Sequence, residues 1–588
     1  MLANNVIYGI NGPVVTVKNT KDFSMQEMVF VGNDRLIGEV IGISSEYTTI
    51  QVYENTTGLK PGEPVYSTSA PMSVTLGPGI LSSIFDGIER PLLEIEKNTG
   101  AFITRGNTAS KLDENKKWKV HVTLKAGDEI NPGQIYATCP ETASIEHKCM
   151  LSPSLPAGVV TSAAADGEYT INDTVLEYTD KSGKTYNVTL CQEWPIRVPR
   201  PIKNRLELHT PLITGQRIID SMLPIAKGGA ASIPGGFGTG KTMTQHQLAK
   251  WCDADIIIYV GCGERGNEMT QVLEEFSDLT DPRTGRLLFD RTVLIANTSN
   301  MPVAAREASI YTGITLAEYY RDMGYDVAMM ADSTSRWAEA LREISGRLEE
   351  MPAEEGFPAY LPSRLSAFYE RAGMVETLGG DNGSITVIGA VSPQGSDFSE
   401  PVTQNTKRFT RVFWALDKAL AYARHYPAIN WMTSYSEYSG DLARWYEENI
   451  NPEFMDLRAQ MLAVLREEDS LMEIVKLIGA DVLPDNQKLI IEIGKVIRVG
   501  FLQQNAYHAE DTYVPLNKQF LMMKVIMHLY NRCSELVSTG MPIGLMTDTG
   551  LFEKLTKMKY DIKNNEPEKF DEYITDIDKT MDALISGR

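Results

Sequence analysis

The sequence predicts a multidomain α/β protein with a β-barrel at its N-terminus and a helical domain at its C-terminus. Two observations support this prediction. First, 588 residues are too many for one hydrophobic core, so several domains are expected. Second, the spacing of apolar residues changes twice along the chain, from short strands, to strands alternating with helices, to helices alone. Each pattern therefore predicts a domain, or domains, of its own kind.

Residues 1–72 are expected to form the small β-barrel, because short apolar runs alternate with turns rich in Gly, Asn and Pro. The clearest strands in this segment are 14–17, 27–31, 38–43 and 48–53. Residues 73–110 are expected to connect the barrel to a nucleotide domain. The pattern then returns to β in residues 111–200, which contain turns such as Asn131-Pro-Gly and Lys181-Ser-Gly-Lys. Residues 195–201, Pro-Ile-Arg-Val-Pro-Arg-Pro, are expected to be an extended linker.

Residues 201–438 alternate apolar strands with helical periodicity, which predicts a parallel sheet covered on both faces. The expected strands are 256–260, 292–296, 327–331 and 385–391, with a helix over 303–323 among them. Strand signals fade in residues 439–588, where a helical domain is expected. Its clearest amphipathic helices are 457–465, 485–499, 516–537 and 551–555.

One short segment matches the phosphate-binding P-loop pattern G-x-x-x-x-G-K-[ST]. Its residues are Gly235, Gly236, Phe237, Gly238, Thr239, Gly240, Lys241 and Thr242. Glycines let backbone N–H groups approach phosphate oxygens, and the following helix directs its positive end at the same phosphates. Lys241 adds a positive charge, and the Thr242 hydroxyl is suited to bind Mg²⁺. A Gly-rich turn without a ligand is the alternative, but a short strand over 230–234 and a helix from Thr242 supply the context that the motif requires.

A second motif, Gly261-Cys-Gly-Glu264-Arg265-Gly-Asn-Glu268, follows the strand 256–260. Ligands of parallel α/β sheets bind at the carboxyl ends of strands, where this turn is expected. Glu264 could orient or deprotonate a water that attacks the γ-phosphate, and Arg265 could neutralise charge on the transferred group. A Gly-flanked turn with a surface ion pair is the alternative.

The third motif is an apolar strand that ends at Asp332, in Tyr325-Asp-Val-Ala-Met-Met-Ala-Asp-Ser. This is the Walker B pattern, in which the aspartate holds Mg²⁺, here expected to act through water. Asp332 could instead cap the helix that follows, and both roles are compatible. The three motifs in this order predict a P-loop nucleoside triphosphatase.

The composition limits the class of ligand and the compartment. The formal charge is −21, from 56 basic and 77 acidic residues, which disfavours nucleic acid as the main ligand. Six cysteines without a C-x-x-C pattern indicate a reduced, cytoplasmic protein. No signal peptide and no run of 18 apolar residues is found, so membrane contact is expected only through partners.

Several motifs together resemble the catalytic A (alpha) subunit of V-type and archaeal-type rotary ATPases. They are Gly235-Gly-Phe-Gly-Thr-Gly-Lys-Thr, Gly261-Cys-Gly-Glu-Arg-Gly-Asn-Glu, Ala331-Asp-Ser-Thr-Ser-Arg-Trp-Ala-Glu-Ala-Leu-Arg-Glu, Phe357-Pro-Ala-Tyr-Leu-Pro-Ser-Arg-Leu, Arg424-His-Tyr-Pro-Ala-Ile-Asn and Phe501-Leu-Gln-Gln-Asn-Ala-Tyr. The resemblance covers nearly the whole chain. It implies that 111–200 is an inserted bulge domain and that 201–438 is RecA-like. Thr239 stands where eukaryotic relatives often carry Cys, which favours a prokaryotic type.

The resemblance also implies roles and partners. Lys241 and Thr242 would bind phosphate and Mg²⁺, Glu264 would be the catalytic glutamate, and Arg265 would stabilise charge beside it. Arg347 in Ile344-Ser-Gly-Arg would be a further arginine on the γ-phosphate side, and Tyr426 and Tyr507 would pack against the adenine of ATP or ADP. Core packing is the alternative for both tyrosines.

The expected assembly is a ring of three A and three B subunits around a central shaft, with a peripheral stalk and a membrane rotor sector that carries H⁺ or Na⁺. The chain would lie on the cytoplasmic side of the membrane, and ATP hydrolysis or synthesis would be coupled to ion flow. The sequence does not distinguish the two ions, nor synthesis from hydrolysis.

Three other functions share some of these motifs. A hexameric nucleic-acid motor would need a basic channel, which the charge disfavours. A non-catalytic nucleotide-holding subunit should lack Lys241 or Glu264, and both are present. An export ATPase of a secretion system should lack the β-rich segment 111–200.

Overall fold

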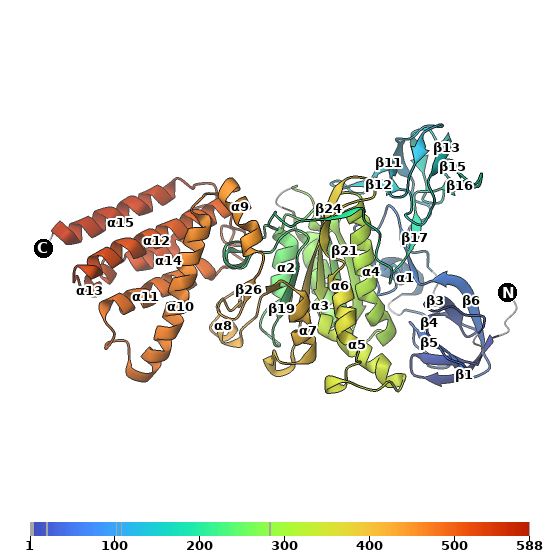
Figure 1. Ribbon diagram of the computed structural model, residues 1–588, viewed down its shortest axis with the longest axis horizontal. Coiled ribbons are helices and arrows are strands. Elements are labelled where there is room, and N and C mark those ends of the chain that lie inside the picture. The colour runs from blue at the N-terminus through green and yellow to red at the C-terminus, as the bar shows by residue number, and fades with distance from the viewer. Residues whose placement is uncertain (1–4, 19–20, 101–102, 107–108, 282–283, 587–588) are drawn as a thin grey trace. The chain divides into compact units, whose positions relative to one another are not determined.

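The computed structural model describes residues 5–18, 21–100, 103–106, 109–281 and 284–586. The chain forms two compact units, whose elements are labelled in Figure 1. The first unit contains Met1–Glu207, Gly228–Ser232 and Ala254–Thr410, and the second contains Leu208–Lys227, Ile233–Asp253 and Arg411–Arg588. The segment 201–438, expected as one nucleotide domain, is thus shared between them. Each unit is described by itself.

The first unit begins with a closed barrel, drawn in blue in Figure 1. Its strands follow the order β1-β2-β5-β4-β3-β6. The strands are β1 Asn5–Asn11, β2 Val14–Val17, β3 Glu27–Val31, β4 Leu36–Ile43, β5 Thr48–Val52 and β6 Pro64–Pro71. Apolar side chains such as Val15, Val29 and Ile50 fill the interior, while their neighbours along each strand are more exposed or polar. The sequence predicted β2 to β5. It did not predict β1 and β6, which close the barrel and leave no free edge.

Two four-stranded sheets follow, in the orders β10-β13-β15-β16 and β12-β11-β9-β14. Their strands are β9 Trp118–Val122, β10 Glu129–Ile130, β11 Ile135–Pro140, β12 Glu146–Met150, β13 Gly158–Ala163, β14 Gly167–Tyr169, β15 Leu176–Asp180 and β16 Thr185–Val188. A separate ribbon pairs β7 (Ser73–Leu76) with β17 (Gln192–Pro195), so the chain enters and leaves this β-rich segment side by side.

The large sheet of the first unit contains the parallel strands β24-β22-β20-β21-β8 in that order. These are β8 Ile84–Phe85, β20 Ile256–Glu264, β21 Thr292–Thr298, β22 Asp326–Asp332 and β24 Asn382–Val391, and β23 (Gly373–Glu376) and β18 (Asn204–Leu206) extend it in the antiparallel sense. Residues 73–110 are therefore more than a connector, because β8 belongs to this sheet. The strand β19 (Ala230–Pro234) begins in this unit, where the N–H of Val387 donates to the carbonyl of Gly229.

Helix α4 is buried along most of its length and packs on β20, β21, β22 and β24. The helices of the first unit are α1 Leu92–Thr99, α3 Gly266–Asp278, η2 Leu288–Arg291, α4 Val303–Asp322, α5 Thr334–Arg347, η3 Glu354–Gly356, α6 Leu361–Tyr369, η4 Gln394–Ser396 and α7 Pro401–Phe409. Helix α4 begins and ends within one residue of the segment predicted from the sequence. Apolar strands covered by helices give the parallel sheet that the periodicity predicted, and the predicted fold class is confirmed.

The segment 195–201 runs along α4 as a strap fixed by buried charges. The Arg197 guanidinium donates to Glu39 in the barrel, at 2.8 Å from each carboxylate oxygen, and to Glu307 of α4 at 2.8 and 3.1 Å. The hydroxyl of Tyr53 donates to Glu39 as well. One arginine therefore pairs with two buried carboxylates, and it joins the barrel to α4.

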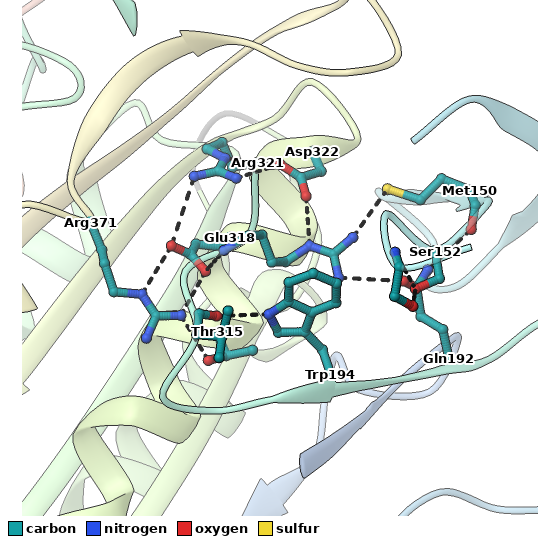
Figure 2. A network of polar contacts seen from close by, with 12 residues as sticks. Met150, Ser152, Gln192, Trp194, Thr315, Glu318, Arg321, Asp322 and Arg371 are labelled. Carbon is teal, nitrogen blue, oxygen red and sulfur yellow. Dashed lines mark hydrogen bonds and ion pairs between the residues drawn. The ribbon is translucent and has the colours of Figure 1, made fainter. Parts of the chain in front are cut away.

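The same strap is fixed further along α4, as Figure 2 shows around Glu318, Asp322 and Arg371. Arg200 pairs with Asp322 at 2.6 Å, and its backbone N–H donates to Glu318 at 2.9 Å. Arg371 pairs with the same Glu318 at 2.6 Å and donates to the carbonyl of Ile196 at 2.9 Å. The sequence predicted an extended linker here, but not that it is anchored by ion pairs.

The second unit combines the P-loop segment with the C-terminal helices. Its elements are η1 Ile218–Met222, the end of β19, α2 Lys241–Trp251, β25 Val412–Phe413, α8 Lys418–Tyr422, β26 Tyr435–Ser436, α9 Ser439–Asn449, α10 Phe454–Ile478, α11 Asp485–Val496, η5 Ile497–Leu502, α12 Leu516–Ser538, α13 Ile543–Thr547, α14 Leu551–Asp561 and α15 Lys569–Ser586. Helices α10, α11, α12, α14 and α15 pack on one another. The predicted helical C-terminus is confirmed, although α9, α13 and α15 were not predicted.

All six cysteines are free, and five of them are buried, the exception being the half-buried Cys191. In the part of the chain that the structure describes, no helix has both the length and the apolar character needed to cross a bilayer.

Candidate active site

The P-loop of the second unit joins the end of β19 to α2, which begins at Lys241. Gly240 caps this helix in the left-handed region, with φ of 89°, and Gly238 has φ of 78°. A Cβ atom on Gly235 would lie 2.6 Å from the Thr239 hydroxyl oxygen and 2.8 Å from the Leu416 Cβ. Glycine is therefore required at these positions by backbone conformation or by space.

Side chains of the loop stabilise its turn. The Thr239 hydroxyl is buried and donates to the carbonyl of Gly236 at 2.8 Å. The Lys241 ammonium donates to the carbonyls of Gly235 at 2.7 Å and Gly236 at 3.3 Å, so it is held over the loop. Phe237 at the tip is 82% exposed. The loop thus presents a cation and the start of a helix together, as an anion site requires.

A cavity of about 620 Å³ opens beside this loop within the second unit. It is lined by Gln216, Ile219, Gly238, Gly240, Met243, Thr244, Gln247, Arg424, Tyr426, Pro427, Gln503, Gln504, Asn505, Ala506, Tyr507 and Tyr560. Tyr426 is 44% exposed and Tyr507 is 88% exposed, so neither ring belongs to the hydrophobic core. The structure brings both predicted tyrosines to one cavity that borders the P-loop.

The two predicted carboxylates lie together in the first unit. Glu264 is the last residue of β20 and Asp332 the last residue of β22, and these parallel neighbours pair Gly261 with Asp332. Both side chains therefore belong to the carboxyl edge of the sheet, where α/β proteins bind ligands.

Burial and charge repulsion govern the electrostatics of this edge. Burial raises the pKa of Glu264 to about 8, the negative charges of Asp332 and Glu268 add to the effect, and the positive charge of Arg336 opposes it. Asp332 is 2% exposed and accepts a hydrogen bond from the Tyr259 hydroxyl at 3.0 Å. Clustered carboxylates of this kind favour a bound cation, which would lower their pKa values.

Arg265 is exposed and precedes the first residue of α3, directly after Glu264. Arg347 lies elsewhere. It ends α5, a 14-residue helix that spans about 20 Å and begins beyond Asp332. A Cβ atom on Gly12 of the barrel would lie 2.8 Å from its guanidinium, and the Asn11 amide donates to its carbonyl at 3.2 Å. The structure therefore places Arg347 against the barrel, at the other end of α5 from Asp332.

Two residues at the carboxylate edge were not assigned roles from the sequence. Tyr259 lies within the apolar run of β20. Its hydroxyl is the only feature that distinguishes it from its apolar neighbours in the sequence. Arg336 follows the Walker B strand, and its charge contribution depends on α5 packing beside β20. Arg336 stands in the motif that begins at Ala331, but neither residue's role follows from a linear motif, because each acts across elements.

The described residues contain no group of three or more His, Cys, Asp or Glu side chains that could hold a metal ion. Mg²⁺ does not need such a cage, because it keeps several waters and binds one or two oxygen ligands together with substrate phosphates. The Thr242 hydroxyl and the Asp332 carboxylate are hard oxygen ligands of the kind that Mg²⁺ accepts.

Four family models match successive parts of the chain. They are the beta-barrel domain of the ATP synthase alpha/beta family at residues 7–69, the ATPsynthase alpha/beta subunit barrel-sandwich domain at 109–197, the nucleotide-binding domain of the ATP synthase alpha/beta family at 215–436, and the C-terminal domain of V and A type ATP synthase at 443–544.

Full-length relatives agree with these matches. The V-type ATP synthase alpha chain of Halothermothrix orenii is 58% identical over 576 residues, which cover 98% of each chain. The chain belongs to the V-type and A-type ATP synthase alpha (A) subunit family. Other members include alpha chain 2 of Clostridium tetani, 60% identical over 95% of this chain and 94% of its own, and the corresponding A-type ATP synthase chain of Methanopyrus kandleri, 56% identical over 98% of each.

Membership of the V-type and A-type alpha (A) subunit family confirms the resemblance carried by the motifs. It makes the chain a nucleotide-binding ATPase or ATP synthase subunit of a larger complex and sets aside the nucleic-acid motor. The assembled ATPase EscN of a type III secretion system has a similar fold, with a TM-score of 0.63 over 89% of this chain and 100% of its own. It is only 20% identical, so this likeness concerns the fold alone.

Proposed function

We propose that this chain hydrolyses or synthesises Mg·ATP as the catalytic subunit of a rotary ATPase that transports H⁺ or Na⁺. The observation that carries the proposal is the presence of both Lys241 and Glu264 in a chain that matches alpha (A) subunits over nearly its full length. A subunit that only holds nucleotide would not need the glutamate.

The phosphate-binding roles are assigned to the P-loop. The N–H groups at the start of α2 and the Lys241 ammonium bind the β- and γ-phosphates, and the Thr242 hydroxyl is a ligand for Mg²⁺. Asp332 would help to hold the ion. When bound, Mg²⁺ neutralises charge that develops on the transferred phosphoryl group.

Glu264 is assigned to the attacking water. Its carboxylate orients the water and accepts a proton as the oxygen attacks the γ-phosphorus, and Arg265 offsets negative charge at the same step. A glutamate with a pKa of about 8 is protonated at neutral pH, so it needs a cation nearby to act as a base. Glu264 is thus suited to act as a base only once a positive charge, such as that of Mg²⁺, lies close to its carboxylate.

The cavity beside the P-loop is assigned to the base of ATP or ADP. Exposed aromatic rings provide flat apolar faces, and Tyr426 and Tyr507 supply two of them. Arg347 receives no role at the phosphates in this proposal, because its contacts with Asn11 and Gly12 favour a structural role between α5 and the barrel.

The remaining partners follow from the family. We infer an alternating ring of three copies of this chain and three B subunits, with a central shaft, a peripheral stalk and a membrane rotor sector. The chain would then lie at the cytoplasmic face of a membrane without crossing it.

The roles of Lys241 and Glu264 are tested in the assembled complex. Lys241→Ala should weaken Mg·ATP binding and turnover together, because the loop loses its full positive charge. Glu264→Gln should still bind Mg·ATP but turn over about 100-fold more slowly or worse. Glu274→Gln, an exposed carboxylate on α3, is the matched control and should keep normal turnover. Near-normal turnover in Lys241→Ala would exclude this loop as the catalytic site.

A further inference from the structure

Helix α14 of the C-terminal helical domain reaches the cavity that we assign to the base. Tyr560 lies near the end of α14 and lines the cavity together with Tyr426 and Tyr507. It is 38% exposed, and its ring centroid lies 4.7 Å from that of His508. The motifs identified only two aromatic residues here, because Tyr560 stands in an ordinary amphipathic helix far along the chain.

The residue before Tyr560 contacts the segment that leads to another part of the cavity lining. Lys559 is 2% exposed, and its ammonium donates to the carbonyls of Val499 at 2.7 Å and Gln503 at 2.8 Å. These carbonyls belong to η5 and the residue that follows it, from which the chain runs directly to Tyr507. Because the buried Lys559 ammonium donates to both carbonyls, it fixes the position of this turn relative to α14.

A second buried cation fixes this turn from another direction. Arg217 is fully buried and donates to the carbonyls of Phe501 and Gln503, and it pairs with Asp511. Asp511 in turn accepts a hydrogen bond from the N–H of Asn505 at 2.7 Å. The loop that carries Tyr507 is therefore held at both ends by buried charge.

We propose that Tyr560 is a third aromatic contact for the purine base and that Lys559 is a positioning residue which fixes the turn leading to Tyr507. The inference rests on the proposed function, because it takes the cavity as the base site of ATP. All of these groups lie in the second unit, and neither residue belongs to the P-loop. Their loss should therefore weaken binding of the base and leave binding of the phosphates unchanged.

The purified full-length chain is tested with two probes, Mg·ATP and Mg·tripolyphosphate, which share phosphates but differ in the base. Tyr560→Ala should weaken Mg·ATP binding by about 5- to 100-fold, the range of base–aromatic stacking, and leave tripolyphosphate within about two-fold. Tyr560→Phe should resemble the unchanged protein. Tyr560→Leu keeps apolar packing and should behave like Tyr560→Ala. Tyr422→Ala, an 85% exposed tyrosine on α8 that does not line the cavity, is the control.

Lys559→Met should weaken Mg·ATP binding by about 10-fold, because it removes two hydrogen bonds from a charged donor, again without affecting tripolyphosphate. Lys559→Arg, which restores a donor cation, should recover part of the affinity. Lys554→Met on the same helix is the control, since Lys554 pairs with Asp576 on the surface. If Tyr560→Leu and Lys559→Met both bind the two probes as the unchanged protein does, the role of α14 is refuted.

The Lys241→Ala variant distinguishes a failure of this inference from a failure of the proposed function on which it rests. If Lys241→Ala weakens the binding of both probes while the α14 variants weaken the binding of neither, the phosphate site is supported and only the α14 inference fails. If Lys241→Ala weakens neither probe, the proposed function itself fails. Equal weakening of both probes by Tyr560→Leu would also overturn the inference, because it would indicate general damage to the unit and no selective loss of the base.

Discussion

Tyr507 is 88% exposed and borders the cavity beside the P-loop. Because so much of its ring is exposed, we expect a bound ligand to contact it. Tyr507→Ala should weaken Mg·ATP binding by about 1–3 kcal/mol if the ring stacks on adenine. Tyr507→Phe keeps the π face and should be almost silent. Equilibrium titration with Mg·ATP measures both. Unchanged affinity in Tyr507→Ala would leave the ring without a role in the base site.

Glu89 is fully buried, which predicts a pH dependence of stability. Burial raises its pKa from 4.5 to about 7, although Lys111 lies 3.2 Å away. Below pH 4.5 the carboxyl is protonated in both states. Between pH 4.5 and 7 it ionises only in the unfolded chain, so stability falls as pH rises, by about 3 kcal/mol in all.

Glu89→Gln removes this titration and keeps an acceptor for the N–H of Thr75, which donates to Glu89 at 2.7 Å. The variant should therefore unfold at a higher temperature than the unchanged protein at about pH 8, and the difference should vanish near pH 4.5. Thermal midpoints at the two pH values provide the measurement. A variant less stable at the higher pH would show that the pairing with Lys111 outweighs burial.

Site residues in contiguous motifs could be predicted from the sequence, and residues that act across elements could not. The P-loop conformation depends on glycines and on the start of α2, which all lie within one short segment. Tyr560 and Lys559 have no such signal, because their role depends on where α14 packs. The Walker B pattern predicted Asp332 as a candidate site residue, whereas the contact of Tyr259 with Asp332 could be recognised only from the pairing of β20 with β22.

At the scale of elements, the strap along α4 is fixed by ion pairs with buried carboxylates. Arg197→Met would leave Glu39 and Glu307 buried without their cation, which should cost about 3–5 kcal/mol of stability. Lys203→Met is the control, because Lys203 pairs with Glu376 at the surface and should matter by less than about 1 kcal/mol. Denaturant unfolding compares the two. Changing Glu39 and Glu307 to Gln in the Arg197→Met background should restore much of the loss.

The accuracy of element prediction followed the strength of the local pattern. The strands β20, β21, β22 and β24 are continuous apolar runs, and their positions were predicted within a few residues. The barrel strand β6 begins and ends in proline and is rich in Ser and Thr, so its pairing with β1 and β3 depends on tertiary context. The strap was recognised as extended from its prolines, while its ion pairs require the positions of α4 and the barrel.

For the whole molecule, we expect the chain to be incomplete as an enzyme. Ring ATPases commonly take an arginine from a neighbouring chain, which is worth roughly 10³- to 10⁵-fold in rate. Within this chain Arg265 adjoins Glu264, whereas Arg347 lies against the barrel. The purified chain alone should therefore bind Mg·ATP but hydrolyse it very slowly. An equimolar complex with the B subunit should restore turnover, and full activity from a verified monomer would refute the shared site.

The distribution of thiols gives the molecule its own set of chemical reporters. Cys191 is the one half-buried thiol, whereas burial raises the pKa of Cys262 and of Cys533 to about 12, which leaves almost no reactive thiolate. A thiol reagent can thus reach the five buried cysteines only when the surrounding structure opens. Cys139, Cys149 and Cys262 belong to the first unit, and Cys252 and Cys533 to the second. The labelling rates of these cysteines would therefore report the opening of each unit separately, and no engineered cysteine is needed.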